Sequence, residues 1–157
     1  MIIIVMGVCG SGKSTIGSDL ASKLDLPFFD ADDFHPKANV NKMANGQPLD
    51  DTDRLPWLEI LANKLKDEQN TVLACSALKE KYREILQSKV DQVHWVYLQG
   101  EKELIAERMK SRGGHYMKGE MLDSQFATLE VPSYGHHISI DQEPEQVVRQ
   151  LIEILNP

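Results

Sequence analysis

The chain has 157 residues, of which 41% are hydrophobic and 26% charged, a composition typical of one globular domain with a hydrophobic core. Its formal net charge of -7 argues against a nucleic-acid partner, because proteins that bind nucleic acid carry clustered Lys and Arg on one face. Cys9 and Cys75 are too few for a disulfide framework and are not spaced as a metal-binding pair. They indicate a reducing compartment, so we expect a cytoplasmic protein.

The first six residues are apolar, but they are too few to cross a membrane and lack the basic start of a secretory signal. We therefore expect neither a signal peptide nor a membrane partner. Branched residues run through positions 2–6 without polar alternation, which is typical of a central parallel strand covered on both faces.

Further along the chain, short apolar runs alternate with segments whose apolar residues recur at helical spacing. This alternation predicts an α/β domain over residues 1–157, with a five-stranded, mostly parallel sheet flanked by helices. The predicted strands are residues 2–6, 26–30, 71–75, 93–98 and 137–141. The predicted helices lie around residues 16–24, 36–43, 55–65, 82–86, 104–109 and 147–155.

Residues 113–135 are rich in glycine and polar residues and show no clear periodicity. A stretch of this length is uncommon as a plain connection in a compact domain and is more often functional. We interpret it as a mobile lid; the alternative is a surface excursion without a role.

Residues 7–14 read Gly-Val-Cys-Gly-Ser-Gly-Lys-Ser and match the phosphate-binding loop pattern Gly-x-x-x-x-Gly-Lys-Ser/Thr. Glycines let successive backbone N–H groups turn towards a phosphate, and the helix that follows points its N-terminus at the same anion. In this pattern Lys13 contacts the terminal phosphates and Ser14 binds magnesium. A predicted strand before the loop and a predicted helix after it supply the context that the motif requires.

Two other classes of protein are excluded by missing residues. A regulatory GTPase shares the loop but also carries Asp-x-x-Gly and Asn-Lys-x-Asp motifs, and this sequence has neither. A cysteine phosphatase loop built on Cys75 needs an arginine six residues later, where this chain has Lys81.

Several further segments, taken with the loop, resemble the gluconate kinase family and follow its order along nearly the whole chain. The resemblance implies a three-layer P-loop kinase fold similar to shikimate kinase and nucleoside monophosphate kinases. It also implies ATP and Mg²⁺, D-gluconate as the small-molecule substrate phosphorylated at its 6-hydroxyl, and a homodimer as one expected arrangement. These segments are residues 30–36, 41–49, 51–58, 75–83, 112–116 and 125–130.

Arg108 and Arg112 lie four residues apart on one predicted helix, just before the lid. There they can close over ATP and stabilise charge on the transferring phosphoryl group; the alternative is that they pair with Glu101 or Glu107 in solvent. We place Pro144 at the adenine. The predicted nucleotide-binding residues are Gly7, Val8, Cys9, Gly10, Ser11, Gly12, Lys13, Ser14, Thr15, Arg108, Arg112 and Pro144.

Three acidic residues follow the second predicted strand, where ligands of parallel sheets bind. We expect Asp32 to accept the hydrogen of the attacking hydroxyl and Asp30 to hold magnesium through water, together with Ser14. One of the three is expected to cap a helix or face solvent, and Asp33 is the candidate.

The substrate segment, about residues 31–58, and the strand ends supply the expected substrate ligands. The planar fork of arginine suits a carboxylate. Ser76 follows a predicted strand and either contacts the substrate or caps a helix. The predicted substrate-binding residues are Asp32, His35, Arg54, Ser76, Arg83 and His115, and the predicted catalytic residues are Lys13, Asp32 and Arg112.

Two alternatives stay open from the sequence. One is a kinase of the same fold that acts on shikimate or on a nucleotide. The other is an ATP-binding module without turnover, which would bind nucleotide but release no ADP in response to an acceptor.

Overall fold

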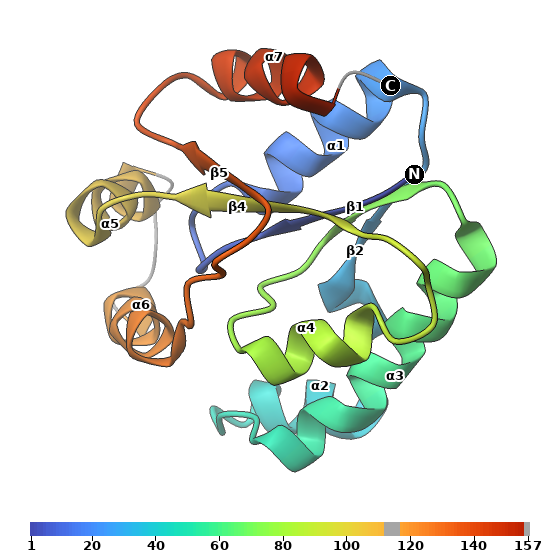
Figure 1. The fold of residues 1–157 in the computed structure, drawn as a ribbon. Coiled ribbons are helices and arrows are strands. Elements are labelled where there is room, and N and C mark those ends of the chain that lie inside the picture. The colour runs from blue at the N-terminus through green and yellow to red at the C-terminus, as the bar shows by residue number, and fades with distance from the viewer. Residues whose placement is uncertain (112–116, 156–157) are drawn as a thin grey trace.

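The computed structural model describes residues 1–111 and 117–155. Within these residues five strands form one sheet in the order β2-β3-β1-β4-β5, and each neighbouring pair is parallel (Figure 1). This confirms the predicted α/β architecture. The strands are β1 Ile2–Met6, β2 Phe28–Asp30, β3 Thr71–Ala74, β4 His94–Gln99 and β5 His136–Ser139.

Helices cover both faces of the sheet, so the molecule has three layers. Helices α1 and α7 lie on one face, and α3 and α4 lie on the other (Figure 1). Within the described ranges, no helix combines the length and the apolar character needed to cross a membrane. The helices are α1 Lys13–Leu24, the 3₁₀ helix η1 Ala31–Phe34, α2 Lys37–Ala44, α3 Asp51–Glu68, α4 Glu80–Leu86, α5 Lys102–Ser111, α6 Met117–Thr128 and α7 Pro144–Leu155.

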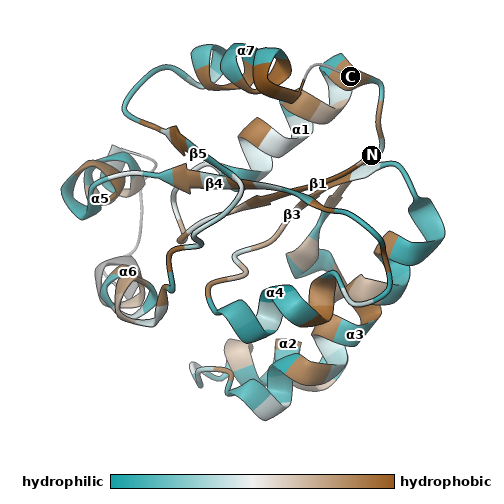
Figure 2. Cartoon of the chain, viewed as in Figure 1, coloured by the Kyte–Doolittle hydropathy of each residue, from teal (hydrophilic) through white to brown (hydrophobic). Residues whose placement is uncertain are grey.

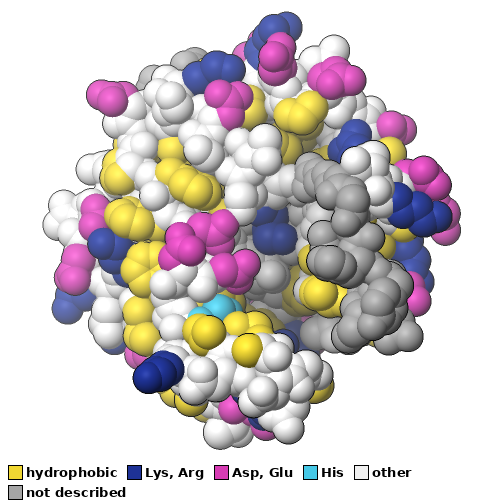
Figure 3. Space-filling model, turned by 180° about the vertical axis from the view of Figure 1, so that it is seen from behind, with side chains coloured by type: hydrophobic (Ala, Val, Ile, Leu, Met, Phe, Trp, Pro, Cys, Tyr) yellow, Lys and Arg dark blue, Asp and Glu magenta, His cyan; other side chains and the backbone are white. Residues whose placement is uncertain are grey.

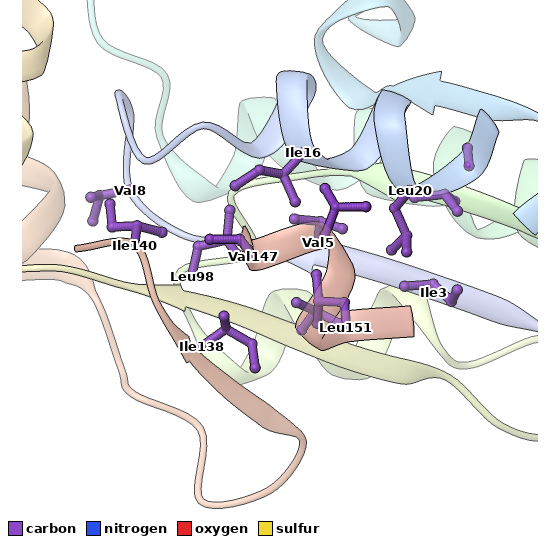
Figure 4. Close-up of a cluster of buried hydrophobic side chains, with 14 of the residues drawn as sticks. Ile3, Val5, Val8, Ile16, Leu20, Leu98, Ile138, Ile140, Val147 and Leu151 are labelled. Carbon is purple, nitrogen blue, oxygen red and sulfur yellow. The ribbon is translucent and has the colours of Figure 1, made fainter. Parts of the chain in front are cut away.

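Strand β1 is buried along its whole length because it lies in the middle of the sheet between two hydrophobic cores. Ile3 and Val5 point to the face covered by α1 and α7, where side chains of both helices meet them (Figure 4). Ile2, Ile4 and Met6 point to the face covered by α3 and α4. Figure 2 shows the same division, with hydrophobic residues on the strands and on the inner sides of the helices. The unbroken apolar run of the sequence is thus explained by burial on both faces.

Helix α6 lies within residues 113–135, where no helix was predicted. Its residues 121–128 form a helix, yet only Leu122 among them is fully buried. Phe126 is only partly buried, so the apolar stripe within residues 121–128 is short, and such a stripe is the signal that sequence periodicity detects.

Helix α3 begins at Asp51, earlier than the apolar spacing of its core residues indicated. The Asp50 carboxylate accepts from the Asp53 backbone N–H at 2.8 Å, and the Asp53 carboxylate accepts from the Asp50 N–H at 2.9 Å. This reciprocal capping box satisfies two N–H groups that the first turn leaves free. It fixes the chain entering α3 beside α2.

A pair of glycines tests how tightly β5 is held against β4. Gly135 and Gly46 both have positive φ, 80° and 75°, but a Cβ on Gly135 would lie 2.8 Å from the Trp95 carbonyl oxygen, whereas one on Gly46 would meet nothing within 4 Å. We expect Gly46→Ala to lower the free energy of unfolding by about 1–2 kcal/mol, the cost of a left-handed alanine. Gly135→Ala should lose about 1–3 kcal/mol more, because the backbone must also shift. Urea denaturation measures both, and equal losses would show that the contact with Trp95 is not tight.

Candidate active site

The carboxyl ends of β1, β2 and β3 surround one cleft with a volume of about 560 Å³. Ligands of parallel sheets bind at this edge, beside the place where the strand order changes direction. Figure 3 shows a face of the molecule hollowed in its middle, where acidic, basic and histidine side chains lie close together. The cleft is lined by Cys9, Gly10, Gly12, Lys13, Ser14, Thr15, Asp30, Asp32, His35, Met43, Ala74, Cys75, Ser76, Met121 and Gln125.

The loop between β1 and α1 has the backbone form of an anion cradle. Gly10 and Gly12 have φ values of 78° and 94°, which residues other than glycine rarely adopt. Gly12 is the N-cap of α1, and no side chain of the described residues caps this helix end; its first turn contains no acidic residue. The free N–H groups of the first turn therefore face the cleft, as in a site for phosphate.

Lys13 crosses the mouth of this loop. Its Nζ donates to the Val8 carbonyl oxygen at 2.9 Å. Burial lowers the pKa of the Lys13 ammonium, although negative charge on Cys9, Cys75, Asp32 and Asp30 would act in the opposite direction. A bound anion would stabilise the charged form of this lysine, because a phosphate nearby compensates the cost of burying the ammonium.

Ser14 and Asp30 form the candidate magnesium pair. The Ser14 hydroxyl donates to Asp30 Oδ2 at 2.5 Å, and Asp30 Oδ1 accepts from the Asp32 N–H at 3.0 Å, which caps η1. The described residues contain no group of three His, Cys, Asp or Glu side chains arranged to hold a metal. Magnesium in nucleotide sites keeps several waters and takes one or two protein ligands plus phosphate oxygens, so one hydroxyl and one carboxylate fit it.

Asp32 lines the cleft, whereas Asp33 does not and is exposed to solvent, as expected for the one of the three aspartates without a role in the site. Desolvation raises the pKa of the Asp32 carboxyl, and the neighbouring Asp30 adds to the effect, whereas His35 and Lys13 oppose it. The Asp32 side chain is nevertheless 84% exposed, so solvent limits these effects.

His35 presents one edge of its ring to the cleft. Its side chain is only 7% exposed, and its Nε2 lies 3.9 Å from Asp32 Oδ1. The ring stacks on Trp57 at a centroid distance of 4.3 Å and an interplanar angle of 13°. Trp57 is held by a hydrogen bond from its Nε1 to the Ala31 carbonyl oxygen, at 2.8 Å. Trp57 therefore supports a residue of the site from the buried side.

Ser76 lies at the end of β3 and lines the cleft, and its carbonyl oxygen accepts from the Gly7 N–H at 3.3 Å. The N-cap of α4 is Lys79, so the alternative that Ser76 caps this helix is wrong. Arg54 does not itself line the cleft. Its Nη1 lies 3.4 Å from the Tyr82 hydroxyl oxygen, and its charge is close enough to His35 to lower the pKa of that ring.

Arg83 does not occupy the position predicted for it. The side chain is 1% exposed, and its guanidinium donates to the carbonyl oxygens of Ala77 at 2.7 Å and Glu130 at 2.8 Å. It also donates to the Glu80 carboxylate and the Tyr134 hydroxyl. Because these groups engage it away from the cleft, the predicted role of Arg83 in substrate binding does not fit the structure. It instead ties the turn after Ser76 to the chain that follows α6.

A second cavity, of about 190 Å³, opens on the other side of the phosphate loop. Arg108 and Pro144 lie together there beside Thr15, and Arg108 Nη2 is 3.4 Å from the Gln142 carbonyl oxygen. These neighbours fit the predicted adenine side of a nucleotide site. Arg112 and His115, the remaining predicted site residues, lie outside the described residues.

Gln125 is a site residue to which sequence reasoning gave no role. Its Oε1 accepts from the Cys9 backbone N–H at 2.6 Å and so connects α6 to the phosphate loop. The only sequence signal was its place in the segment 125–130. On the two rims of the cleft, Met43 of α2 and Met121 of α6 expose 43% and 47% of their surface.

Comparison with known proteins gives the family of the chain and several similar proteins. Residues 9–156 match the shikimate kinase family. A thermoresistant gluconokinase from Escherichia coli K12 is 41% identical over 162 residues, 98% of this chain and 93% of that protein. A gluconokinase from Gluconobacter oxydans is 41% identical over 157 residues, 96% of this chain and 88% of that protein. The crystal structure of a gluconokinase from Sinorhizobium meliloti 1021 matches with a TM-score of 0.89 at 37% identity and covers 99% of this chain and 95% of its own.

The structural role of Arg83 can be tested by removing its guanidinium. We expect Arg83→Ala to lower the free energy of unfolding by about 2–4 kcal/mol, because two carbonyl groups and a carboxylate lose their partner. Arg149→Ala, on the exposed face of α7, is the matched control and should change it by about 0.5 kcal/mol or less. Chemical denaturation measures both variants. An Arg83→Ala protein of parental stability that binds its acceptor weakly would restore the substrate role.

Proposed function

The chain belongs to the shikimate kinase family, and from this membership and its site we propose that it is a gluconokinase. It transfers the γ-phosphoryl group of ATP to the 6-hydroxyl of D-gluconate and gives 6-phospho-D-gluconate and ADP. The observation that carries the proposal is that a phosphate loop and a pair of carboxylates open into the same cleft. The choice of D-gluconate as the acceptor is supported by relatives called gluconokinase, at about 40% identity over nearly the full chain.

The nucleotide occupies the loop side of the cleft. The first-turn N–H groups of α1 and the Lys13 ammonium bind the terminal phosphates, while Arg108 and Pro144 border the nucleoside end. Ser14 and Asp30 would hold Mg²⁺, which would supply positive charge against the phosphates. Phosphoryl transfer asks the protein mainly for such positioning and charge stabilisation.

The acceptor occupies the side of the cleft formed by residues 31–58 and the end of β3. Asp32 accepts the hydrogen of the attacking hydroxyl, and His35 and Ser76 contact other hydroxyls of the sugar acid. Arg54 supplies positive charge for the acceptor carboxylate. Within the single domain that we infer for residues 1–157, residues 113–135 act as the lid. Arg112 and His115 are the further residues that we assign to the phosphates and the acceptor.

The acceptor can be identified by ADP release measured with D-gluconate, shikimate and a nucleoside monophosphate in parallel. We expect turnover to depend on gluconate, because the site pairs hydroxyl-binding groups with a cation for a carboxylate. Robust turnover of shikimate or of the nucleotide without turnover of gluconate would reassign the enzyme within its family. Nucleotide binding without any acceptor-dependent ADP release would indicate a binding module.

Neighbouring aspartates provide a matched test of the catalytic carboxylate. We expect Asp32→Asn to lower kcat by about 10²–10⁴-fold, because the amide cannot take the hydrogen of the attacking hydroxyl. Asp33→Asn removes the same charge one residue away, outside the cleft, and should leave kcat close to the parental value. Steady-state kinetics with saturating ATP measures both. Equal effects of the two changes would mean that charge near η1, rather than the Asp32 carboxylate itself, supports the reaction.

A further inference from the structure

Asn39 is a buried polar residue that the proposed reaction leaves without a role. It lies on α2 and is only 4% exposed, although asparagine is usually found at the surface. Its amide nitrogen Nδ2 lies 3.2 Å from His35 Nδ1 and 3.0 Å from the Asp53 backbone carbonyl oxygen. A buried amide that contacts a residue of the site from behind is a candidate for positioning it.

The Asp53 carbonyl decides which way the Asn39 amide points. A carbonyl oxygen only accepts hydrogen bonds, so the group facing it has to be the amide NH₂. Turning the amide over would place two oxygen acceptors against each other in a buried position. The capping box that holds Asp50 and Asp53 keeps this carbonyl at the start of α3.

The same NH₂ group faces His35, and this fixes the proton on the ring. Because the NH₂ nitrogen donates, His35 Nδ1 has to accept with its lone pair. A neutral imidazole carries one N–H, which then sits on Nε2. Nε2 is the edge of the ring that lines the cleft, and its distance of 3.9 Å from Asp32 Oδ1 is too long for a hydrogen bond between them.

The charges around His35 agree with a neutral ring. Burial lowers the pKa of the imidazole and Arg54 on α3 lowers it further, whereas Asp32 on η1 raises it. Trp57 stacks on the ring and opposes a 180° flip, which would place the ring carbon Cδ2 instead of Nδ1 opposite Asn39.

We propose that Asn39 is a positioning residue that holds His35 as the Nε2–H tautomer, so that the ring donates a hydrogen bond to a hydroxyl oxygen of the acceptor beside Asp32. The identity of the ligand in this proposal rests on the proposed function, whereas the tautomer of His35 does not depend on it. A hydroxyl is donor and acceptor at once, so it suits a gap between a carboxylate that accepts and an imidazole N–H that donates. The pair Asn39–His35 thus favours hydroxylated acceptors.

The ring itself is tested without substrate, by ¹⁵N NMR of the histidine side chains, with His35→Gln used to assign the His35 signals. We expect the parental protein at neutral pH to show Nδ1 unprotonated and Nε2 protonated. A ring that carries its proton on Nδ1, or both protons, would overturn the proposal whatever the acceptor is. A correct tautomer in a protein that does not phosphorylate gluconate would leave the inference intact and reject only the acceptor.

Asn39→Asp replaces the donor by an acceptor of the same size. In this variant the proton moves to Nδ1, the neutral ring no longer donates from Nε2, and the acceptor KM should rise about 10-fold or more while the ATP KM stays near its parental value. As the pH falls, the ring takes a second proton and regains the Nε2–H, so the acceptor KM of Asn39→Asp should fall again. The added carboxylate raises the pKa of the ring, so this recovery begins at a higher pH than it would without that carboxylate.

Asn39→Leu is the control, because it removes the amide without adding a charge. It should raise the acceptor KM less than Asn39→Asp does and recover only at a lower pH, because no added carboxylate raises the pKa of its ring. Thermal unfolding of both variants checks that they are folded. The same pH profile in the two variants, or an unchanged acceptor KM in Asn39→Asp, would mean that Asn39 only packs between α2 and α3. If neither variant folds, the NMR measurement on the parental protein still decides the tautomer.

Discussion

The burial of β1 is the constraint on which the rest of the site depends. A strand covered on both faces cannot shift its register without exposing apolar side chains on one face or the other, so the point where it ends is fixed. The phosphate loop starts at that point, and the hydrogen bond from Gly7 to the Ser76 carbonyl joins it to the end of β3. The cradle is therefore positioned by the core, and the carboxylates at the end of β2 are placed relative to it through the same sheet.

Asp30 and Asp53 each stabilise a local element of the fold and also position a group of the site. One oxygen of Asp30 caps η1 and thereby sets the direction of Asp32, while the other receives the hydroxyl of Ser14 from α1. The backbone of Asp53 orients Asn39 while its side chain closes the capping box of α3. A substitution at such a position changes the stability of an element and the geometry of the cleft together, so its kinetic effect has to be read beside its effect on folding.

The sequence predicted the sheet, the phosphate loop and the acidic pair because each has a local signal: an unbroken apolar run, a glycine spacing, and carboxylates at the end of a strand. It could not predict that Arg83 turns away from the cleft, since its partners at Ala77 and Glu130 are backbone groups that any residue could supply. Asn39 was missed although the helix that carries it was predicted, because the role of an amide depends on the groups that it faces. The helix around Leu122 was missed because its apolar pattern is weak.

The two walls of the cleft are anchored with unequal strength, and this difference bears on how the acceptor enters. Lys13 and Asp30 belong to elements joined to the central sheet, and Trp57, which supports His35, is itself buried. Helix α6 brings Met121 and Gln125 to the opposite wall, and within its residues 121–128 Leu122 is the only fully buried side chain. An element with so little buried surface separates from the rest at a lower free-energy cost than one packed on both sides. The groups that need accurate placement therefore lie on the side of the cleft that is packed against the central sheet. The α6 side contributes a hydrogen bond from the Cys9 N–H to Gln125 and the exposed side chain of Met121. We propose that this division lets the cleft admit a polar acceptor without disturbing Lys13, Asp30 and Asp32.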